Sequence, residues 1–281
     1  MNPLSIFSRS SVLFTALFIC CTFLQAQQIG LQLYSLRNQF KTDVPGTLAK
    51  IKEWKIREIE GGGTYGLPMD QYKKMLAENN LKMISVGSEF DLLAKNPQAA
   101  IDEAKTFGAK YITCFWIPHK DDDFTIDDMK RAVEVFTTAG KLINKNGLSL
   151  CYHTHGYEFR PYGDGTLFDY LVKNTDPRYV NFEMDVFWVK HPGQDPVVLL
   201  KKYPKRFPML HLKDRQPGTD GNQNGHADEE TNVVLGKGDV GIAAIMKRAK
   251  KYGVKHYFIE DESTRSLEQI PQSLQYLHSL K

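Results

Sequence analysis

The sequence predicts a single-domain α/β protein built as a closed (β/α)8 TIM barrel. Eight short apolar segments alternate with eight segments of helical periodicity, and such alternation implies parallel strands joined by right-handed crossovers. Residues 27–281 are a usual length for one barrel, and no Gly-, Ser- or Pro-rich linker divides them. A doubly wound open sheet is the alternative, but no Gly-x-Gly-x-x-Gly motif follows the first strand to support it.

The predicted strands are apolar along their length and polar only where they end. This pattern is typical of parallel strands that are covered on both faces and carry functional groups at their carboxyl ends. In chain order, the strands are expected within residues 29–37, 56–63, 81–90, 109–118, 148–155, 179–188, 206–214 and 254–261.

The intervening helices are identified by their apolar faces and by the residues at their ends. In the first, Leu48, Ile51 and Trp54 share one face. Pro97 is suited to the first turn of the third, and Pro271 is expected to kink the last helix or to begin its second part. The helices are expected within residues 43–55, 67–80, 96–108, 125–147, 166–174, 195–204, 241–253 and 266–281.

The N-terminal segment predicts export. Arg9 is the only charged side chain in residues 1–26, and the apolar run 12–24 is too short for a typical membrane span. Ala26 offers a cleavage position, so we interpret residues 1–26 as a signal peptide and residues 27–281 as the barrel domain. The alternative is a lipoprotein that begins at one of the cysteines of this run. We expect an exported protein, periplasmic in a bacterium, with no membrane association beyond export.

Charge excludes nucleic acid as an expected partner. The formal net charge is +3, and without the single charge of the signal segment it is +2. A nucleic-acid-binding face would need clustered Lys and Arg, and we interpret the basic run Lys201, Lys202, Lys205 and Arg206 as a solvated helix end and turn. The expected partner is a small molecule, and the oligomeric state stays open.

Residues that bind metals or move protons gather where the last four strands end. Because the carboxyl ends of barrel strands meet at one face, these side chains are expected to form one site. Asp, Glu and His together suit one divalent ion such as Mn, Co, Mg or Zn. The candidates are His153, His155 and Glu158 after the fifth strand, Asp185 after the sixth, His211 and Lys213 with the seventh, and Glu260 with the eighth.

A family resemblance rests on the ordered runs YHTHGYEF, EMDVFW, HLKD and FIEDE. Together they resemble the xylose isomerase-like TIM barrel superfamily, the AP endonuclease 2-like group of sugar isomerases and epimerases. The resemblance implies one divalent ion held by two Glu, one Asp and one His. Carried onto this chain, the ligands are Asp185, His211, Glu260 and, from the fifth strand, Glu158. The alternative for the fifth strand is His153, which stands where the family often has its Glu.

The resemblance also implies a reaction. A metal that binds a carbonyl and its neighbouring hydroxyl acidifies the C–H between them, and a carboxylate removes that proton to give an enediolate. Glu260 is assigned as the base and Glu158 as the acid or second base. Lys213 and His155 are assigned to stabilise oxyanion charge. The expected function is therefore a metal-dependent sugar isomerase or epimerase that acts on a ketose or keto-sugar.

The substrate contacts leave two further functions open. His153, Trp188 and Trp116 are the substrate-binding candidates, and Trp188 stands where related epimerases have a substrate-binding His. The pairing of DVFW with HLKD resembles exported family members, some of which act on 3-keto-glycosides, so a lyase or hydratase with the same first step is one alternative. The other is a non-catalytic exported sugar-binding protein, which the intact carboxylate and imidazole set disfavours.

Overall fold

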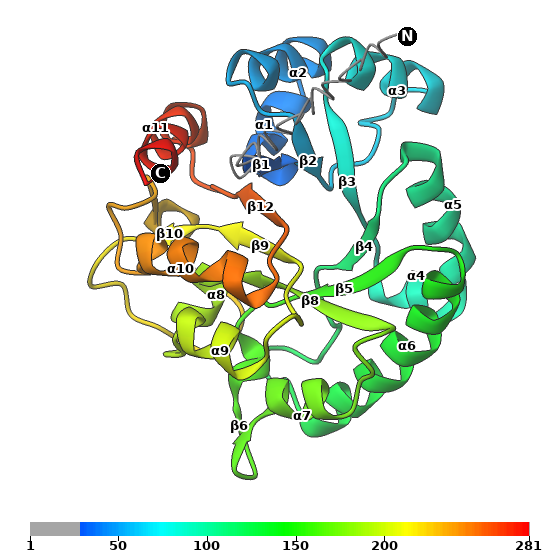
Figure 1. The fold of residues 1–281 in the computed structure, drawn as a ribbon, viewed down its shortest axis with the longest axis vertical. Helices are drawn as coiled ribbons and strands as arrows, with labels where there is room; N and C mark the ends of the chain where they lie inside the picture. The colour runs from blue at the N-terminus through cyan, green and yellow to red at the C-terminus, as the bar shows by residue number, and fades with distance from the viewer. Residues whose placement is uncertain (1–28, 281) are drawn as a thin grey trace, which may run out of the picture.

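The computed structural model describes residues 29–280, which form a closed barrel of parallel strands in the order β1-β12-β9-β8-β5-β4-β3-β2 (Figure 1). The predicted (β/α)8 barrel is confirmed and the open sheet is wrong. The proposed signal peptide, residues 1–26, lies outside the described residues. The barrel strands are β1 (Ile29–Gln32), β2 (Glu58–Glu60), β3 (Lys82–Gly87), β4 (Tyr111–Cys114), β5 (Ser149–His153), β8 (Val180–Asp185), β9 (Met209–Leu212) and β12 (His256–Ile259).

Helices surround the strands, each within the range that the sequence predicts (Figure 1). Local chemistry explains their ends: Thr125 and Asp128 form a capping box, and Gly108 ends its helix in the left-handed region at φ 68°. Pro271 lies within one unbroken helix, so it does not begin a separate part. These helices are α2 (Val44–Glu53), α3 (Met69–Glu78), α5 (Pro97–Phe107), α6 (Ile126–Lys145), α7 (Leu167–Lys173), α9 (Pro196–Lys202), α10 (Ile242–Ala249) and α11 (Ser266–Ser279).

Short elements that the sequence did not predict shorten several strands at their carboxyl ends. Asp185 shows the cause: its Oδ1 accepts hydrogen bonds from the backbone N–H groups of Phe187 and Trp188, which turns the chain from β8 into a helix. The short helices are η1 (Leu33–Leu36), α1 (Arg37–Phe40), α4 (Phe90–Lys95), α8 (Val186–Lys190), η2 (Tyr157–Phe159), η3 (Glu229–Thr231) and η4 (Lys250–Tyr252). The antiparallel pairs are β6 (Pro161–Tyr162) with β7 (Gly165–Thr166), and β10 (Asp214–Arg215) with β11 (Asn232–Val233).

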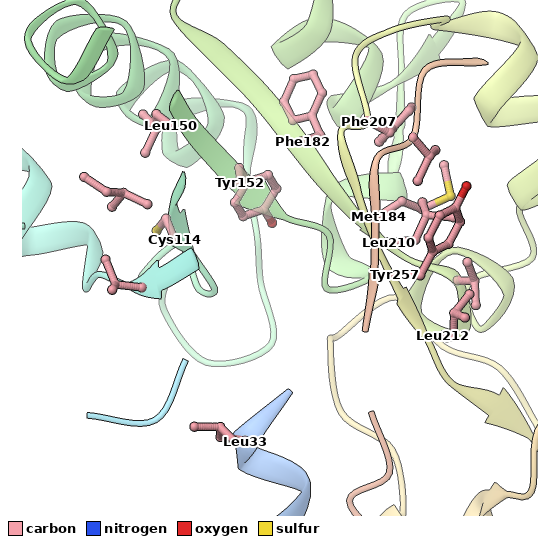
Figure 2. Close-up of a cluster of buried hydrophobic side chains, with 14 of the residues drawn as sticks. Leu33, Cys114, Leu150, Tyr152, Phe182, Met184, Phe207, Leu210, Leu212 and Tyr257 are labelled. Carbon is pink, nitrogen blue, oxygen red and sulfur yellow. The ribbon is translucent and has the colours of Figure 1, made fainter. Parts of the chain in front are cut away.

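Apolar side chains fill the space between strands and helices. Figure 2 shows part of this core, including Leu150 and Tyr152 of β5 and Phe182 of β8, all without exposed surface. Because successive strand residues point to opposite faces, the residues between them, Cys151 and His153 among them, point into the barrel. Cys114 and Cys151 are both buried free thiols. None of the helices in residues 29–280 has the length and hydropathy that a bilayer span requires.

The long connection after β9 is anchored at both ends by Asp214. Its carboxylate accepts backbone N–H groups of Gly236, Gly238 and Val240 at 2.8 to 3.1 Å. Between these ends the loop is also held to the segment that follows β5, because Arg160 Nε donates to the backbone carbonyl of Gln223. The loop is therefore fixed beside the carboxyl ends of the strands.

Candidate metal centre and active site

Side chains that point into the barrel form layers along its axis. On β8, Glu183 and Asp185 are two residues apart and share the inner face; on β9, Met209, His211 and Lys213 follow the same period. Met209 belongs to an apolar layer at the amino-terminal end of the strands, and the polar residues lie above it. The other members of this apolar layer are Ile84, Tyr111, Cys151 and Phe258.

Four buried side chains form the candidate ligand cluster: His153, Asp185, His211 and Glu260. Each offers an atom within 4.8 Å of the others. His211 Nδ1 lies 3.2 Å from Glu260 Oε2, and His153 Nε2 lies 3.9 Å from Asp185 Oδ2. Asp185 Oδ2 is buried without a hydrogen-bond partner. A buried, unpaired carboxylate oxygen is costly unless a cation neutralises it, so the donor set fits a divalent ion.

Glu158, the expected ligand of the fifth strand, lies outside this cluster. Gly156, at φ 99°, turns the chain after β5 into η2, and Glu158 Oε1 there accepts the backbone N–H of His155 at 2.9 Å. Its carboxylate is neither among the clustered ligand atoms nor among the residues that line the cavity described below. Of the two fifth-strand candidates, it is therefore His153, the alternative, that lies in the cluster. Glu158, expected as acid or second base, does not line this cavity, and its carboxylate instead holds the backbone that carries His155.

Two further carboxylates lie beneath the ligands and have no exposed surface. Glu183 Oε2 is 3.2 Å from both His153 Nδ1 and His211 Nε2, and Glu60 Oε2 is 2.5 Å from His211 Nε2. Burial would lower the pKa of His211, but Glu183 and Glu260 raise it well above its usual range. Glu183 was not among the residues predicted from the sequence, although its position two residues before Asp185 on a strand is a signal that it shares the inner face.

The remaining charges set the protonation of the cluster. Burial raises the pKa of Asp185 to about 7, although Lys213 lowers it. Burial alone would raise the pKa of Glu260, but Lys213 and His211 hold it well below its usual range. Burial lowers the pKa of His153, and the neighbouring His211 reinforces this effect. Glu260 is thus the ionised group and His153 the neutral imidazole at the site.

Lys213 lies behind two carboxylates and is almost fully buried. Its Nζ donates to Glu262 and lies 3.5 Å from Glu260 Oε2. Burial would lower its pKa, but Glu262 and Glu260 raise it, so the ammonium stays charged. The cavity is lined by these two carboxylates and not by Lys213, which therefore acts on the site through them.

A cavity of about 640 Å³ opens on the cluster. Its walls include all three predicted substrate-binding residues, His153, Trp188 and Trp116, together with His155 and Glu260. His155 stacks on Trp188, with ring centroids 4.6 Å apart, and meets Trp116 edge-on at 4.8 Å. Burial and Lys213 lower the pKa of His155 to about 3, so a neutral imidazole faces the cavity. The long loop contributes His226, whose ring lies 5.8 Å from Trp116.

Comparisons with known proteins agree with this architecture. Residues 48–280 match the family described as xylose isomerase-like TIM barrel. A crystal structure named sugar phosphate isomerase/epimerase, from Parabacteroides distasonis ATCC 8503, superposes with a TM-score of 0.73 at 27% identity, covering 91% of this chain and 95% of that one. The probable 3-DHS dehydratase AsbF from Bacillus anthracis superposes with a TM-score of 0.69 at 16% identity, over 90% of this chain and 99% of that one, which shows the fold alone.

Curated relatives match over shorter stretches. An inosose dehydratase of Bacillus anthracis is 32% identical over 95 residues, which are 32% of this chain and 30% of that protein. Inosose dehydratase 1 of Bacillus cereus (strain ZK / E33L) is 26% identical over 178 residues, 55% of this chain and 58% of that protein. The chain thus spans about a third to just over half the length of these relatives.

Proposed function

This chain belongs to the xylose isomerase-like TIM barrel family, and we propose that it is a divalent-metal-dependent enzyme that removes a proton next to a sugar carbonyl. The observation that carries this proposal is the buried cluster of His153, Asp185, His211 and Glu260, which opens on a cavity with an aromatic wall. Carboxylates and imidazoles placed together at the carboxyl ends of barrel strands are suited to metal and proton chemistry.

The residues of the site would have different roles in this reaction. The four clustered residues would hold the ion, which when bound supplies Lewis-acid activation of a carbonyl and its neighbouring hydroxyl. Glu260 lines the cavity and stays ionised beside Lys213, so its carboxylate can accept the proton. His155 lines the cavity with a neutral imidazole, which can donate its N–H to the developing oxyanion.

The charge of the cavity favours an uncharged keto-sugar over a sugar phosphate. Four carboxylates line it, those of Glu89, Glu103, Glu260 and Glu262, and none of the described lining residues is Lys or Arg. A phosphate group is usually bound by cationic or backbone N–H donors and is repelled by carboxylates. Trp188 and Trp116 offer instead the flat apolar surfaces on which a sugar ring packs.

A lyase or dehydratase is the second candidate. The inosose dehydratases among the relatives favour it, and so does Trp188, which stands where related epimerases have a substrate-binding His. In a lyase the enediolate expels a leaving group from the β carbon instead of regaining its proton, so the first proton transfer is shared. The N-terminal segment leads us to propose that the enzyme works outside the cytoplasm, in a bacterium in the periplasm.

Deuterium exchange tests the proposal. The metal-loaded protein is incubated in D2O with unphosphorylated ketoses, the matching phosphates and keto-glycosides, and the sugars are followed by NMR. We expect deuterium beside the carbonyl of an unphosphorylated sugar, lost in Glu260→Gln and kept in Glu134→Gln, an exposed control on α6. The identity of the product then distinguishes isomerisation from elimination. Absence of exchange with every sugar, with sugar binding unaffected by chelation, would leave a binding protein.

A further inference from the structure

Both candidate imidazole ligands stand between two layers of carboxylate. Towards the cavity, His153 Nε2 faces Asp185 and His211 Nδ1 faces Glu260, at 3.9 and 3.2 Å. On the other side of each ring the second nitrogen faces Glu183 or Glu60, neither of which the reaction outlined above uses.

The second layer is placed where it can select which nitrogen carries the proton. A neutral imidazole has one N–H and one lone pair, so a ring that offers its lone pair to a cation must donate its N–H elsewhere. Glu183 Oε2 lies 3.2 Å from His153 Nδ1, and Glu60 Oε2 lies 2.5 Å from His211 Nε2. Both carboxylates are thus placed to accept those N–H groups.

We propose that Glu183 and Glu60 are positioning residues that hold the two imidazoles in the tautomers a divalent ion requires. Glu183 accepts Nδ1–H of His153 and leaves Nε2 free, and Glu60 accepts Nε2–H of His211 and leaves Nδ1 free. The inference rests on the metal site of the proposed function, and it is independent of which sugar or reaction the site serves.

The support is built into the barrel itself. His153 and Glu183 are register partners on β5 and β8, so the backbone ladder fixes the distance between them. β8 supplies the ligand Asp185 from the same inner face, two residues further on. A carboxylate held in this way restricts ring rotation, which is the usual role of hydrogen-bond partners behind metal-bound histidines.

Glu60 is held as firmly from the opposite wall. Gln32 Nε2 lies 3.3 Å from its Oε2, and Thr113 Oγ1 lies 3.3 Å from its Oε1. The Thr113 hydroxyl is itself 2.7 Å from that of Ser85. This chain of hydrogen bonds runs from β1 through β2 and β4 to β3, and it keeps Glu60 aimed at His211.

The same atoms allow a competing assignment, a second cation. Glu60, Glu183 and His211 also place ligand atoms within 4.8 Å of one another. However, His211 would then have to offer a lone pair from both nitrogens, which requires the loss of both ring protons. The hydrogen-bonded arrangement requires the loss of only one ring proton, so it is the one we adopt, and metal stoichiometry distinguishes the two.

Cobalt(II) titration of the purified apo-protein tests the inference without any sugar. Affinity and stoichiometry come from calorimetry, and the visible spectrum of the bound ion reports its coordination. We expect one Co2+ per chain, with affinity about 10–100-fold weaker and an altered spectrum in Glu183→Gln and in Glu60→Gln. Glu134→Gln is the matched control with unchanged affinity, and thermal unfolding of each apo-variant confirms that it folds.

A double-mutant cycle separates positioning from a general effect of charge. If Glu183 acts through His153, most of the cost of Glu183→Gln disappears in a His153→Gln background. Full additivity, unchanged Co2+ affinity in both single variants, or two Co2+ ions per chain would each overturn the inference. Tight Co2+ binding with the expected losses but no deuterium exchange would overturn the proposed reaction and leave this inference standing.

Discussion

Replacement of Glu158 by Gln should change how stability depends on pH. The carboxylate is fully buried, its Oε2 has no hydrogen-bond partner, and burial raises its pKa from 4.5 to about 8 against the backbone N–H groups that lower it. The folded chain therefore keeps this proton up to about pH 8, whereas the unfolded chain releases it near 4.5. Since the folded state binds more protons in this window, the stability that the neutral acid provides is complete below pH 4.5 and is lost as pH rises towards 8.

The size of the effect follows from the shift. A rise from 4.5 to about 8, with each unit worth about 1.4 kcal/mol, corresponds to about 5 kcal/mol lost across the window. Gln has no proton to lose. The free energy of unfolding of Glu158→Gln should therefore rise by about that amount, relative to the parent, between acid and alkaline pH. The cause is that Glu158 is buried and its Oε2 has no hydrogen-bond partner, so burial penalises the charged form of the carboxylate.

Urea unfolding of the chelated protein at pH values from about 5 to about 9 measures the effect. Chelation keeps a bound ion from changing the charges near His155. The exposed Glu134→Gln is the control and should follow the parent at every pH. If the stability of Glu158→Gln has the same pH dependence as that of the parent, the carboxylate is ionised in the folded protein and the reasoning from its burial fails.

Two further predictions concern the ion and the loop. Addition of Mn2+ or Zn2+ to the chelated protein should raise Tm, because an ion at about a hundredfold excess over its Kd adds about 3 kcal/mol, and an unchanged Tm with every divalent ion would contradict the metal site. Asp214→Ala should lower the free energy of unfolding by about 3 kcal/mol or more, since it leaves the N–H groups of Gly236, Gly238 and Val240 unpaired. The urea midpoint and limited proteolysis within residues 216–235 measure this, and protease resistance equal to the parent would show that the loop is anchored elsewhere.

The barrel could be predicted from the sequence because its signals are local. Alternation of strand and helix patterns, caps such as Thr125 and stops such as Gly108 each depend on a few neighbouring residues. The ends of the strands were placed too late, because Asp185 binds the backbone beyond it and turns the chain early. Periodicity cannot register such a side-chain cap, since the apolar residues that follow continue the pattern of a strand.

The site was harder to predict because its members meet only through the fold. Glu60 and His211 are 151 residues apart in the chain and come within 2.5 Å of each other. Glu158 was chosen as a ligand for its residue type and its nearness to the fifth strand, but the turn at Gly156 directs its carboxylate back to the backbone N–H of His155. The contact between Glu60 and His211 has no local signal in the sequence, and the turn at Gly156 is a local feature whose effect on Glu158 depends on its backbone conformation.

The identity of residue 153 follows from its neighbour across the sheet. Position 153 faces Glu183 in the β5–β8 register, and both side chains are buried. A carboxylate at 153 would oppose that of Glu183 directly, and two buried carboxylates at such a distance cannot both ionise. An imidazole accepts the same position without repulsion, donates one N–H to Glu183 and keeps its other nitrogen for a metal. Glu183, a residue outside the ligand set, therefore favours an imidazole over a carboxylate at position 153.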